Sequence, residues 1–310
     1  MKRSLLLIML LAGAATQADD GVTLRIADQK GNMRAQLEAT NLLENLPYHI
    51  EWAEFPAAAP LAEALNAGAV DVGIIGDAPL LFSIAAGSQV KAVAVDKSDP
   101  YGTAVVVNKD SAIKTVADLK GKSIGTGRGS VGHFVALKAL EQAGIKPEEV
   151  HFRYLTPSDA KIALASGAVD AWATWDPYTA LAETSGTGRV LVSGRGLSTG
   201  NSFLAATDSA LANETKRKAL QDYINRLAEA EKQAYANIDN YSVTLAKIIG
   251  FPKEAIRLSF GRRQSHWQAI DSATITQQQE TADFYQKQGL INKPLQVEPT
   301  FYRGLTVQAQ

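Results

Sequence analysis

Apolar and polar positions alternate between two periods along most of the chain. Strand-like runs with a period of two or a continuous apolar character are separated by segments with helical spacing. The first five segments, in the order strand, helix, strand, helix and strand, are residues 23–27, 33–44, 48–55, 61–67 and 70–75. The second helical segment stops at Gly68, a residue that commonly ends a helix. This alternation predicts an α/β architecture with mostly parallel sheets flanked by helices.

Two stretches of sequence return about one hundred residues later. Residues 64–71 (ALNAGAVD) recur as residues 163–170 (ALASGAVD), at an offset of 99. Residues 26–32 (IADQKGN) match residues 124–130 (IGTGRGS), at an offset of 98. Both members of the second pair read as a strand, a turn with a basic residue and a glycine, and the start of a helix. Two matches at nearly one offset indicate two α/β lobes of similar build.

The two repeats indicate where the chain divides into lobes. We expect a first lobe over residues 22–105 and a second lobe over residues 106–195, with residues 104–107 crossing between them. Beyond this point the pattern becomes loop-like and then, from Asn213 onward, mostly helical. We predict that residues 196–310 return to the first lobe and cover it with helices. Nothing in this last region suggests catalysis.

The composition narrows the class of protein. The 310 residues include 31 Lys and Arg against 32 Asp and Glu, and 46% are hydrophobic. This is an ordinary globular composition, and its charge balance gives no electrostatic reason to expect nucleic acid or anionic lipid as the main partner. The chain has no cysteine. Disulfides, thiolate metal sites, a cysteine nucleophile and a lipid-modified N-terminal cysteine are therefore excluded.

The N-terminal segment has the pattern of a secretory signal peptide. Lys2 and Arg3 precede an apolar stretch, residues 4–14, that is too short to span a bilayer comfortably. Small residues follow, and we expect cleavage after Ala18, which removes residues 1–18. A membrane-anchoring helix is the alternative. Export of the mature protein makes enzymes that use a cytosolic pool of nucleotides unlikely candidates.

Each predicted lobe contains one glycine-bearing turn between a strand and a helix. These turns are residues 28–32 (DQKGN) and residues 126–130 (TGRGS). Ligands of open parallel sheets bind beyond the carboxyl ends of the strands. The helix that follows each turn exposes unpaired N–H groups that attract anions. Two such turns facing each other would hold one small anion; simple tight turns are the alternative.

The second turn also matches a dinucleotide-binding fingerprint, through Gly127, Gly129 and Gly132. The acidic residue that normally binds the ribose is missing at the end of the next predicted strand. Export also removes the supply of such a cofactor. We therefore expect no cofactor.

The most unusual segment is residues 172–178 (WATWDPY), which holds two of the four tryptophans of the chain. Alternation along the strand places Trp172 and Trp175 on opposite faces. We expect Trp172 in the core, whereas Trp175 either packs there or lines a pocket against an apolar group of a ligand. Asp176 comes before Pro177, which is typical of a residue that caps the N-terminus of a helix.

The histidines do not indicate a metal centre. None of the four has metal-ligand spacing, and no G-x-S-x-G motif is present. We therefore expect no metal and find no support for a hydrolase triad. His133 lies one helical turn beyond the second glycine turn. It either donates to a bound anion or packs inside the lobe.

Taken together, these segments resemble the periplasmic solute-binding proteins of the aliphatic-sulfonate, nitrate and taurine uptake family, and most of all the sulfonate-binding members. The resemblance runs from the N-terminal segment to about residue 290. The matching stretches are QKG at 29–31, WAEFP at 52–56, EALN at 63–66, GDAP at 76–79, IKTVADLKG at 113–121, YLTP at 154–157, DAWA at 170–173, WDPY at 175–178 and SFLAA at 202–206. One departure is that residues 130–133 read SVGH, without the consecutive serines that sulfonate-binding members tend to carry before the histidine. Gly127 stands where those members have glutamine.

The resemblance implies a type II periplasmic-binding-protein fold with two lobes and a ligand cleft between them. It also implies a periplasmic, monomeric protein without enzymatic activity. Such a protein would close on a small anionic ligand of the sulfonate class and deliver it to an ABC permease and its ATPase in the inner membrane. One alternative is an enzyme on the same fold, similar to pyrimidine-precursor synthases, which would require a reactive His133. Another is a ligand-sensing partner of a membrane receptor.

We predict that helix N-termini together with hydroxyl and amide donors hold the sulfonate oxygens, and that Trp175 covers the alkyl part. A carboxylate such as that of Asp77 would repel an anion unless the ligand also carries an amine. The residues expected to line the site are Gln29, Gly31, Asn32, Asp77, Ala78, Ser130, His133 and Trp175.

Overall fold

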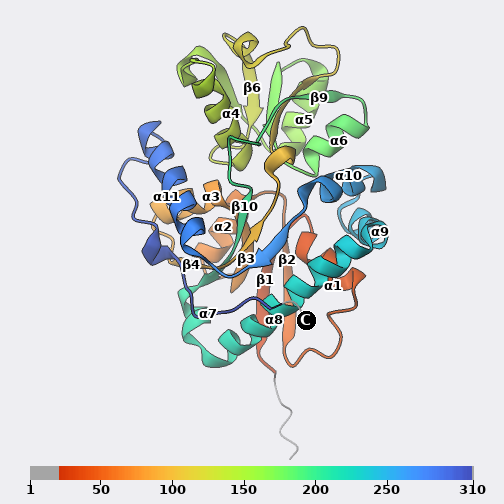
Figure 1. The fold of residues 1–310 in the computed structure, drawn as a ribbon, viewed down its shortest axis with the longest axis vertical. Helices are drawn as coiled ribbons and strands as arrows, with labels where there is room; N and C mark the ends of the chain where they lie inside the picture. The colour runs from red at the N-terminus through yellow and green to blue at the C-terminus, as the bar shows by residue number, and fades with distance from the viewer. Residues whose placement is uncertain (1–20, 309–310) are drawn as a thin grey trace, which may run out of the picture.

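Two β-sheets, each flanked by helices, form two lobes in a computed structural model that describes residues 21–308 (Figure 1). In sheet order, the strands of the first lobe are β11 (His266–Gln268), β4 (Val90–Lys97), β10 (Asn201–Thr207), β3 (Val72–Gly76), β1 (Thr23–Gln29) and β2 (His49–Phe55). Those of the second lobe are β7 (His151–Tyr154), β6 (Ser123–Thr126), β8 (Ala171–Thr174), β5 (Ala104–Asn108) and β9 (Gly188–Ser193). The α/β, two-lobed fold predicted from the sequence is confirmed.

The helices connect these strands and form most of the C-terminal region. They are α1 (Asn32–Ala39), α2 (Ala58–Asn66), α3 (Asp77–Ala85), α4 (Val131–Gln142), α5 (Pro157–Ser166), α6 (Tyr178–Thr184), α7 (Asp208–Ala212), α8 (Glu214–Ala236), α9 (Ile238–Ile249), α10 (Lys253–Arg263) and α11 (Ser272–Lys287). Short 3-10 turns are η1 (Pro100–Gly102), η2 (Val116–Leu119), η3 (Pro147–Glu149) and η4 (Glu298–Thr300). Helix α1 ends earlier than its sequence pattern predicts, because residues 40–45 form successive turns.

The two lobes repeat one arrangement of strands. β1 pairs in parallel with β2 and β3, as β6 pairs in parallel with β7 and β8. The repeated sequence GAVD explains part of this likeness. The carboxylate of Asp71 accepts from the Arg25 N–H at 3.0 Å, and that of Asp170 accepts from the Ser123 N–H at 2.8 Å. In each lobe, the aspartate therefore fixes the start of the third strand against the first.

The chain crosses between the lobes earlier than the sequence predicts. Residues 104–107 do not cross; they belong to β5, which pairs with β8 and β9 inside the second sheet. Four consecutive buried apolar residues (AVVV) suit a strand covered on both faces better than a connection. The crossings are residues 98–103 and 194–200. They lie side by side, because the Ser98 N–H donates to the carbonyl of Gly200 at 3.2 Å.

The C-terminal region packs on both lobes, not on the first lobe alone. Helix α8 covers α1 and β1 of the first lobe. Helix α11 contacts the second lobe, where Phe284 and Tyr285 pack edge-to-face against Phe134 of α4 at 5.2 and 5.3 Å. Helix α10 packs against α6. Figure 1 shows α11 and α10 at opposite sides of the junction between the lobes.

The predicted signal peptide, residues 1–18, lies outside the described residues. Within residues 21–308, no helix combines the length and the apolar character needed to cross a bilayer.

Candidate ligand-binding site

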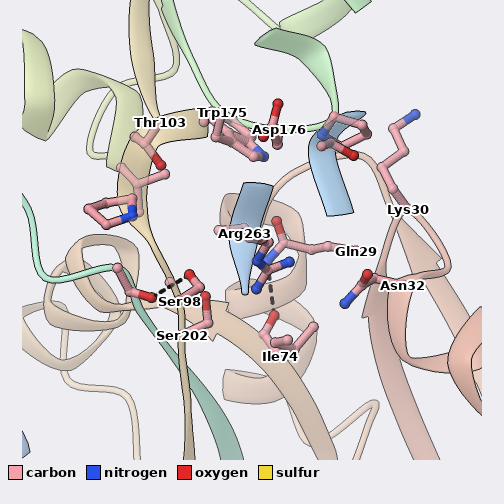
Figure 2. Close-up of a pocket in the computed structure, with 18 of the residues that line it drawn as sticks. Gln29, Lys30, Asn32, Ile74, Ser98, Thr103, Trp175, Asp176, Ser202 and Arg263 are labelled. Atoms are coloured by element: carbon pink, nitrogen blue, oxygen red, sulfur yellow. Dashed lines mark hydrogen bonds between the residues drawn. The ribbon is translucent and has the colours of Figure 1, made fainter. Parts of the chain in front are cut away.

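A cavity of about 160 Å³ lies between the lobes, at the carboxyl ends of the parallel strands (Figure 2). Both glycine-bearing turns reach its wall, the first through Gln29, Lys30 and Asn32 and the second through Ser130 and Val131. The rest of the wall comes from the two crossings, from helices α9 and α10, and from the ends of β3, β8 and β10 with the helix starts that follow β2 and β3. The structure therefore brings the two turns to one cavity. We call this space the inter-lobe cavity.

The N-terminus of α1 does not present free N–H groups to this cavity. The Gly31 N–H donates to Oε2 of Glu54 at 2.8 Å, and the Arg34 N–H donates to Oδ2 of Asp28 at 2.9 Å. Burial, with the nearby Glu54 charge, raises the pKa of Asp28 to about 7. Gly31 is not part of the cavity wall. It has a left-handed φ of 61°, and the side chain of Ile248 lies so close that there is no room for a Cβ atom. Its predicted role as an anion ligand is not supported, because two carboxyl groups already occupy this helix end.

The first turn instead contributes two side-chain amides. Nε2 of Gln29 donates to the carbonyl of Ile74 at 2.9 Å. Oδ1 of Asn32 accepts from the Tyr241 hydroxyl at 2.7 Å. This bond holds the amide oxygen of Asn32 and leaves the amide nitrogen as the other end of the group. Within residues 21–308 this nitrogen has no acceptor, so it remains available to a ligand.

The second turn presents Ser130 but not His133. The Ser130 hydroxyl oxygen caps α4 by accepting from the His133 N–H at 3.1 Å. The His133 side chain is buried away from the cavity wall, where Nδ1 accepts from the Gly129 N–H at 3.2 Å. Its ring packs edge-on against Phe152 at 4.9 Å. Of the two roles left open by the sequence, the geometry supports packing.

Burial of His133 predicts a loss of stability in acid. Burial, together with the charge of Arg128, lowers the pKa of His133 to about 4, whereas an unfolded histidine titrates near pH 6.5. The contribution of neutral His133 to the free energy of unfolding is complete above pH 6.5. It is lost as the pH falls toward 4, because in this range the histidine takes up a proton only in the unfolded chain. From pH 8 to pH 5 we expect the free energy of unfolding to fall by about 2 kcal/mol from this residue. Urea unfolding of His133→Gln should show a correspondingly shallower pH dependence. A change of the same size in His151→Gln, which alters an exposed histidine, would contradict this assignment.

Asp77 lies on the cavity wall, but its carboxylate is already occupied. Oδ2 accepts from the Thr199 hydroxyl at 2.7 Å, and Oδ1 accepts from the Ala78 N–H at 2.7 Å. Burial raises the pKa of Asp77. Ala78 is fully buried and is not part of the wall. Its N–H therefore caps an internal carboxylate and is not offered to a ligand.

The two tryptophans differ in burial, but they do not lie on opposite faces of a strand, because β8 ends at Thr174 and both rings pack against Tyr178. Trp172 is buried in the core of the second lobe, whereas Trp175 lines the cavity and packs edge-on against Tyr178 at 5.9 Å. Asp176 is not the N-cap expected from the sequence, because that position is Pro177, but from one residue earlier its carboxylate accepts from the Ala180 N–H of the first turn at 3.0 Å. It also forms a two-pronged ion pair with Arg262, at 2.7 and 2.8 Å. That partner comes from the C-terminal region, where the sequence indicated no site.

Helices α9 and α10 contribute to the cavity, although their sequences contain no signal of a site. Five residues of these helices line it: Tyr241, Leu245, Ser259, Phe260 and Arg263. A pair of arginines in the last turn of a helix is also a common helix-ending pattern. No local signal distinguished these residues from that ordinary role.

A second hollow, of about 450 Å³, opens beside the inter-lobe cavity. Ser130 and Trp175 belong to both walls, so they lie at the boundary. Most of its other lining residues are apolar, and we call it the apolar chamber. They include Pro56, Ala57, Ala58, Ala59, Pro60, Ala62, Pro79, Phe82, Tyr154, Leu155 and Pro157. Arg128 also lines it.

Acidic and histidine side chains are not gathered for a metal. Over residues 21–308, no group of three or more His, Asp or Glu side chains is placed to hold a metal ion.

Comparison with known proteins places this architecture among transport proteins. Residues 23–243 match a family model described as ABC transporter, phosphonate, periplasmic substrate-binding protein. An aliphatic sulfonates-binding protein of Escherichia coli (strain K12) is 35% identical over 93% of this chain and 91% of its own. The alkanesulfonate-binding protein from Xanthomonas axonopodis pv. citri, solved bound to MOPS, has a TM-score of 0.86 and 33% identity, covering 92% of this chain and 99% of that one.

An enzyme also shares the fold. A desulfurization enzyme superposes with a TM-score of 0.66 but only 16% identity, over 91% of this chain and 97% of its own. At that identity the likeness concerns the fold alone. The relatives that match at higher identity are named as binding proteins.

Proposed function

The chain belongs to the periplasmic substrate-binding proteins of ABC transporters, and on that premise we propose that it captures an aliphatic sulfonate. We further propose that it is exported by its N-terminal signal peptide, acts in the periplasm as a monomer, and passes the ligand to an ABC permease driven by its ATPase. Capture requires no catalytic group.

The proposal of a sulfonate ligand is supported by one observation: the polar inter-lobe cavity and the apolar chamber meet at Trp175. On one side, the inter-lobe cavity offers polar donors without an acceptor among residues 21–308. These donors are the side chains of Asn32, Thr103, Trp175 and Ser202. On the other side, the wall of the apolar chamber is mostly apolar, with Arg128 as its one charged residue among those described. A small inorganic anion would leave the apolar chamber unused, whereas an alkanesulfonate has one part for each space.

Two of the three carboxylates on the cavity wall repel such an anion only weakly, because each is paired with an arginine. Asp77 has neutral donors only, and its burial raises its pKa, which favours the uncharged form. Asp176 pairs with Arg262. Asp99 pairs with Arg195 at 2.6 Å. A sulfonate carries no proton to donate, so it requires donors only. We therefore propose Gln29, Asn32, Ser130 and Trp175 as contacts and keep Asp77 only as a wall residue whose carboxylate is occupied. We remove Gly31, Ala78 and His133 from the predicted set.

Closure of the lobes would complete capture. The helices α10 and α11 already contact both lobes at the sides of the cleft. Water excluded on closure no longer competes for the ligand oxygens, and the remaining hydrogen bonds become stronger in the lower dielectric.

A chain-length series tests the proposed ligand. If the alkyl part enters the apolar chamber, each added methylene from ethanesulfonate to pentanesulfonate should strengthen binding by up to about 0.8 kcal/mol, or about fourfold. Binding should also raise the melting temperature in proportion to ligand saturation. Calorimetric titration and thermal shift measure both. Nitrate, taurine and a sulfate ester serve as comparison ligands. An affinity that does not change with chain length, or no response to any sulfonate, would contradict the proposal.

A further inference from the structure

We propose that Arg263 is the cation that binds the anionic group of the ligand, and that Asp96 and Glu231 behind it control its position and its charge. The inference rests on the proposed function only in that the ligand is an anion.

The charged groups of the inter-lobe cavity leave few candidates for this role. Within residues 21–308, the charged residues on its wall are Lys30, Asp77, Asp99, Asp176 and Arg263. The three aspartates have the partners described above. The Lys30 ammonium lies 5.7 Å from the ring centres of Tyr178 and Phe251. Figure 2 shows the Lys30 side chain extending away from the centre of the cavity, whereas the Arg263 guanidinium faces into it.

Arg263 is only partly satisfied by the protein. Nη2 donates to Oδ2 of Asp96 at 2.5 Å, while Nε and Nη1 have no acceptor among residues 21–308. The Arg263 side chain is 23% exposed and that of Asp96 is 1% exposed. The ion pair therefore presents its positive end to the cavity and keeps its negative end behind. A planar guanidinium with two free donor positions suits the oxygens of a sulfonate.

The preceding residue shows what a purely structural arginine looks like in the same helix turn. Arg262 uses Nε and Nη2 on Asp176 and Nη1 on Glu183, so every nitrogen of its guanidinium has an acceptor. Arg263 has one acceptor and an open side toward the cavity. The contrast indicates that the free donors of Arg263 are left for a ligand.

A second buried carboxyl group lies behind the pair. Oε1 of Glu231 accepts from the Ser265 hydroxyl at 2.5 Å, and Oε2 has no partner among the described residues. Oδ1 of Asp96 is also buried without a partner. Two ionised carboxylates beside one guanidinium would make this site negative. Burial, reinforced by the Asp96 charge, raises the pKa of Glu231 to about 8, so Glu231 is neutral near pH 7.

This arrangement makes anion binding sensitive to alkaline pH. Above pH 8 Glu231 ionises, adds a negative charge behind Arg263 and weakens the attraction for the ligand. The titratable and charged groups that face Glu231 come from four further elements and from α8 itself. They are Asp96 on β4, Arg263 on α10, Tyr241 on α9 and Tyr235 on α8, together with His266 on β11, whose charge acts on Asp96. Replacement of Glu231 alone isolates its contribution.

The test is calorimetric titration of the full mature chain with butane-1-sulfonate, butylphosphonate and nitrate. Arg263→Gln should weaken binding about a hundredfold or more, because a desolvated charge pair with the ligand is lost. Arg263→Lys keeps the charge without the planar fork and should recover part of the affinity. Arg257→Gln removes an exposed arginine from the same helix and should bind like the wild type.

Two further variants keep the outcome interpretable. Arg263→Gln leaves the Asp96 carboxylate buried and unpaired. The double variant Arg263→Gln, Asp96→Asn removes that charge as well, so its affinity reports the loss of Arg263 alone. Glu231→Gln should retain the affinity at pH 7 and lose the weakening that the wild type shows between pH 7 and pH 9. Circular dichroism and thermal melting establish that each variant is folded.

The outcomes separate this inference from the proposed ligand. A folded double variant with wild-type affinity overturns the role of Arg263. A Glu231→Gln protein with the same alkaline weakening as the wild type overturns the role of Glu231. If the wild type binds butylphosphonate but not the sulfonate, and Arg263→Gln abolishes that binding, the proposed ligand is wrong and the inference stands. If the wild type binds none of the three anions, both are wrong.

Discussion

Replacing Gly132 with alanine should lower the free energy of unfolding by about 3 kcal/mol and should weaken ligand binding. Gly132 is in the first turn of α4, where the helix meets β8. An added Cβ atom would lie 2.6 Å from the carbonyl oxygen of Ala173 and 2.7 Å from the nitrogen of Thr174. These are backbone atoms of a central strand, which cannot move aside without breaking its pairing. The helix has to shift instead.

A shift of α4 disturbs the site directly. Ser130 caps this helix and lies on the wall of the inter-lobe cavity, while Trp175 follows the strand against which Gly132 packs. The loss of affinity for butane-1-sulfonate should therefore accompany the loss of stability. Urea unfolding and calorimetric titration of the same preparation measure the two effects.

Gly261→Ala is the matched control. Gly261 is also within a helix, α10, but an added Cβ atom there would lie 3.4 Å from the end of the Ile238 side chain. Alanine is favoured over glycine inside a helix by about 1 kcal/mol, so this variant should be as stable as the wild type or slightly more stable. Equal stabilities for Gly132→Ala and Gly261→Ala would contradict the prediction, because they would show that a Cβ atom fits between α4 and β8 without loss of stability.

Removing the guanidinium of Arg262 should cost about 3–5 kcal/mol of stability. Arg262 is 12% exposed and Asp176 is 8% exposed, so both charges are largely withdrawn from water. Two bonds to Asp176 and one to Glu183 hold this arginine of α10 against the second lobe. In Arg262→Met, the Asp176 carboxylate would remain buried without its cation. Because Asp176 follows Trp175, affinity for the ligand should fall as well.

A double variant separates the effect of the unpaired Asp176 charge from the effect of lost side-chain packing. Arg262→Met combined with Asp176→Asn removes both charges and should recover much of the lost stability, measured by urea unfolding. Arg257 is on the same helix as Arg262 and forms an exposed pair with Asp239 of α9, so Arg257→Met should cost at most about 1 kcal/mol. A loss of similar size in Arg257→Met and Arg262→Met would mean that helix propensity, not the buried ion pair, determines the result.

Gly132 also explains one motif that the sequence left without a function. The G-x-G-x-x-G spacing was disfavoured as a nucleotide site, yet its third glycine has the helix-to-strand packing role that such a glycine serves in nucleotide-binding folds. The first two glycines shape the turn, and Gly129 has a φ of 71°. The spacing therefore reports a close approach of helix and strand and not the identity of a ligand.

The sequence by itself determined the α/β class, the two similar lobes and the position of the two turns. Each of these depends on local periodicity or on a repeated local motif, such as the aspartate of GAVD that binds the first strand of its own lobe. Patterns of this kind can be recognised from a short segment of the sequence, without knowing what packs against it.

Only the tertiary structure decided which polar groups remain available to a ligand. The amide of Gly31 is taken by Glu54, and His133 is turned into the second lobe. Arg263 reaches the cavity from a helix more than 200 residues away in sequence from the first turn. Hydrogen-bond partners and buried charges are settled by contacts between distant segments. The spacing of residues along one segment carries no record of what another segment places against it.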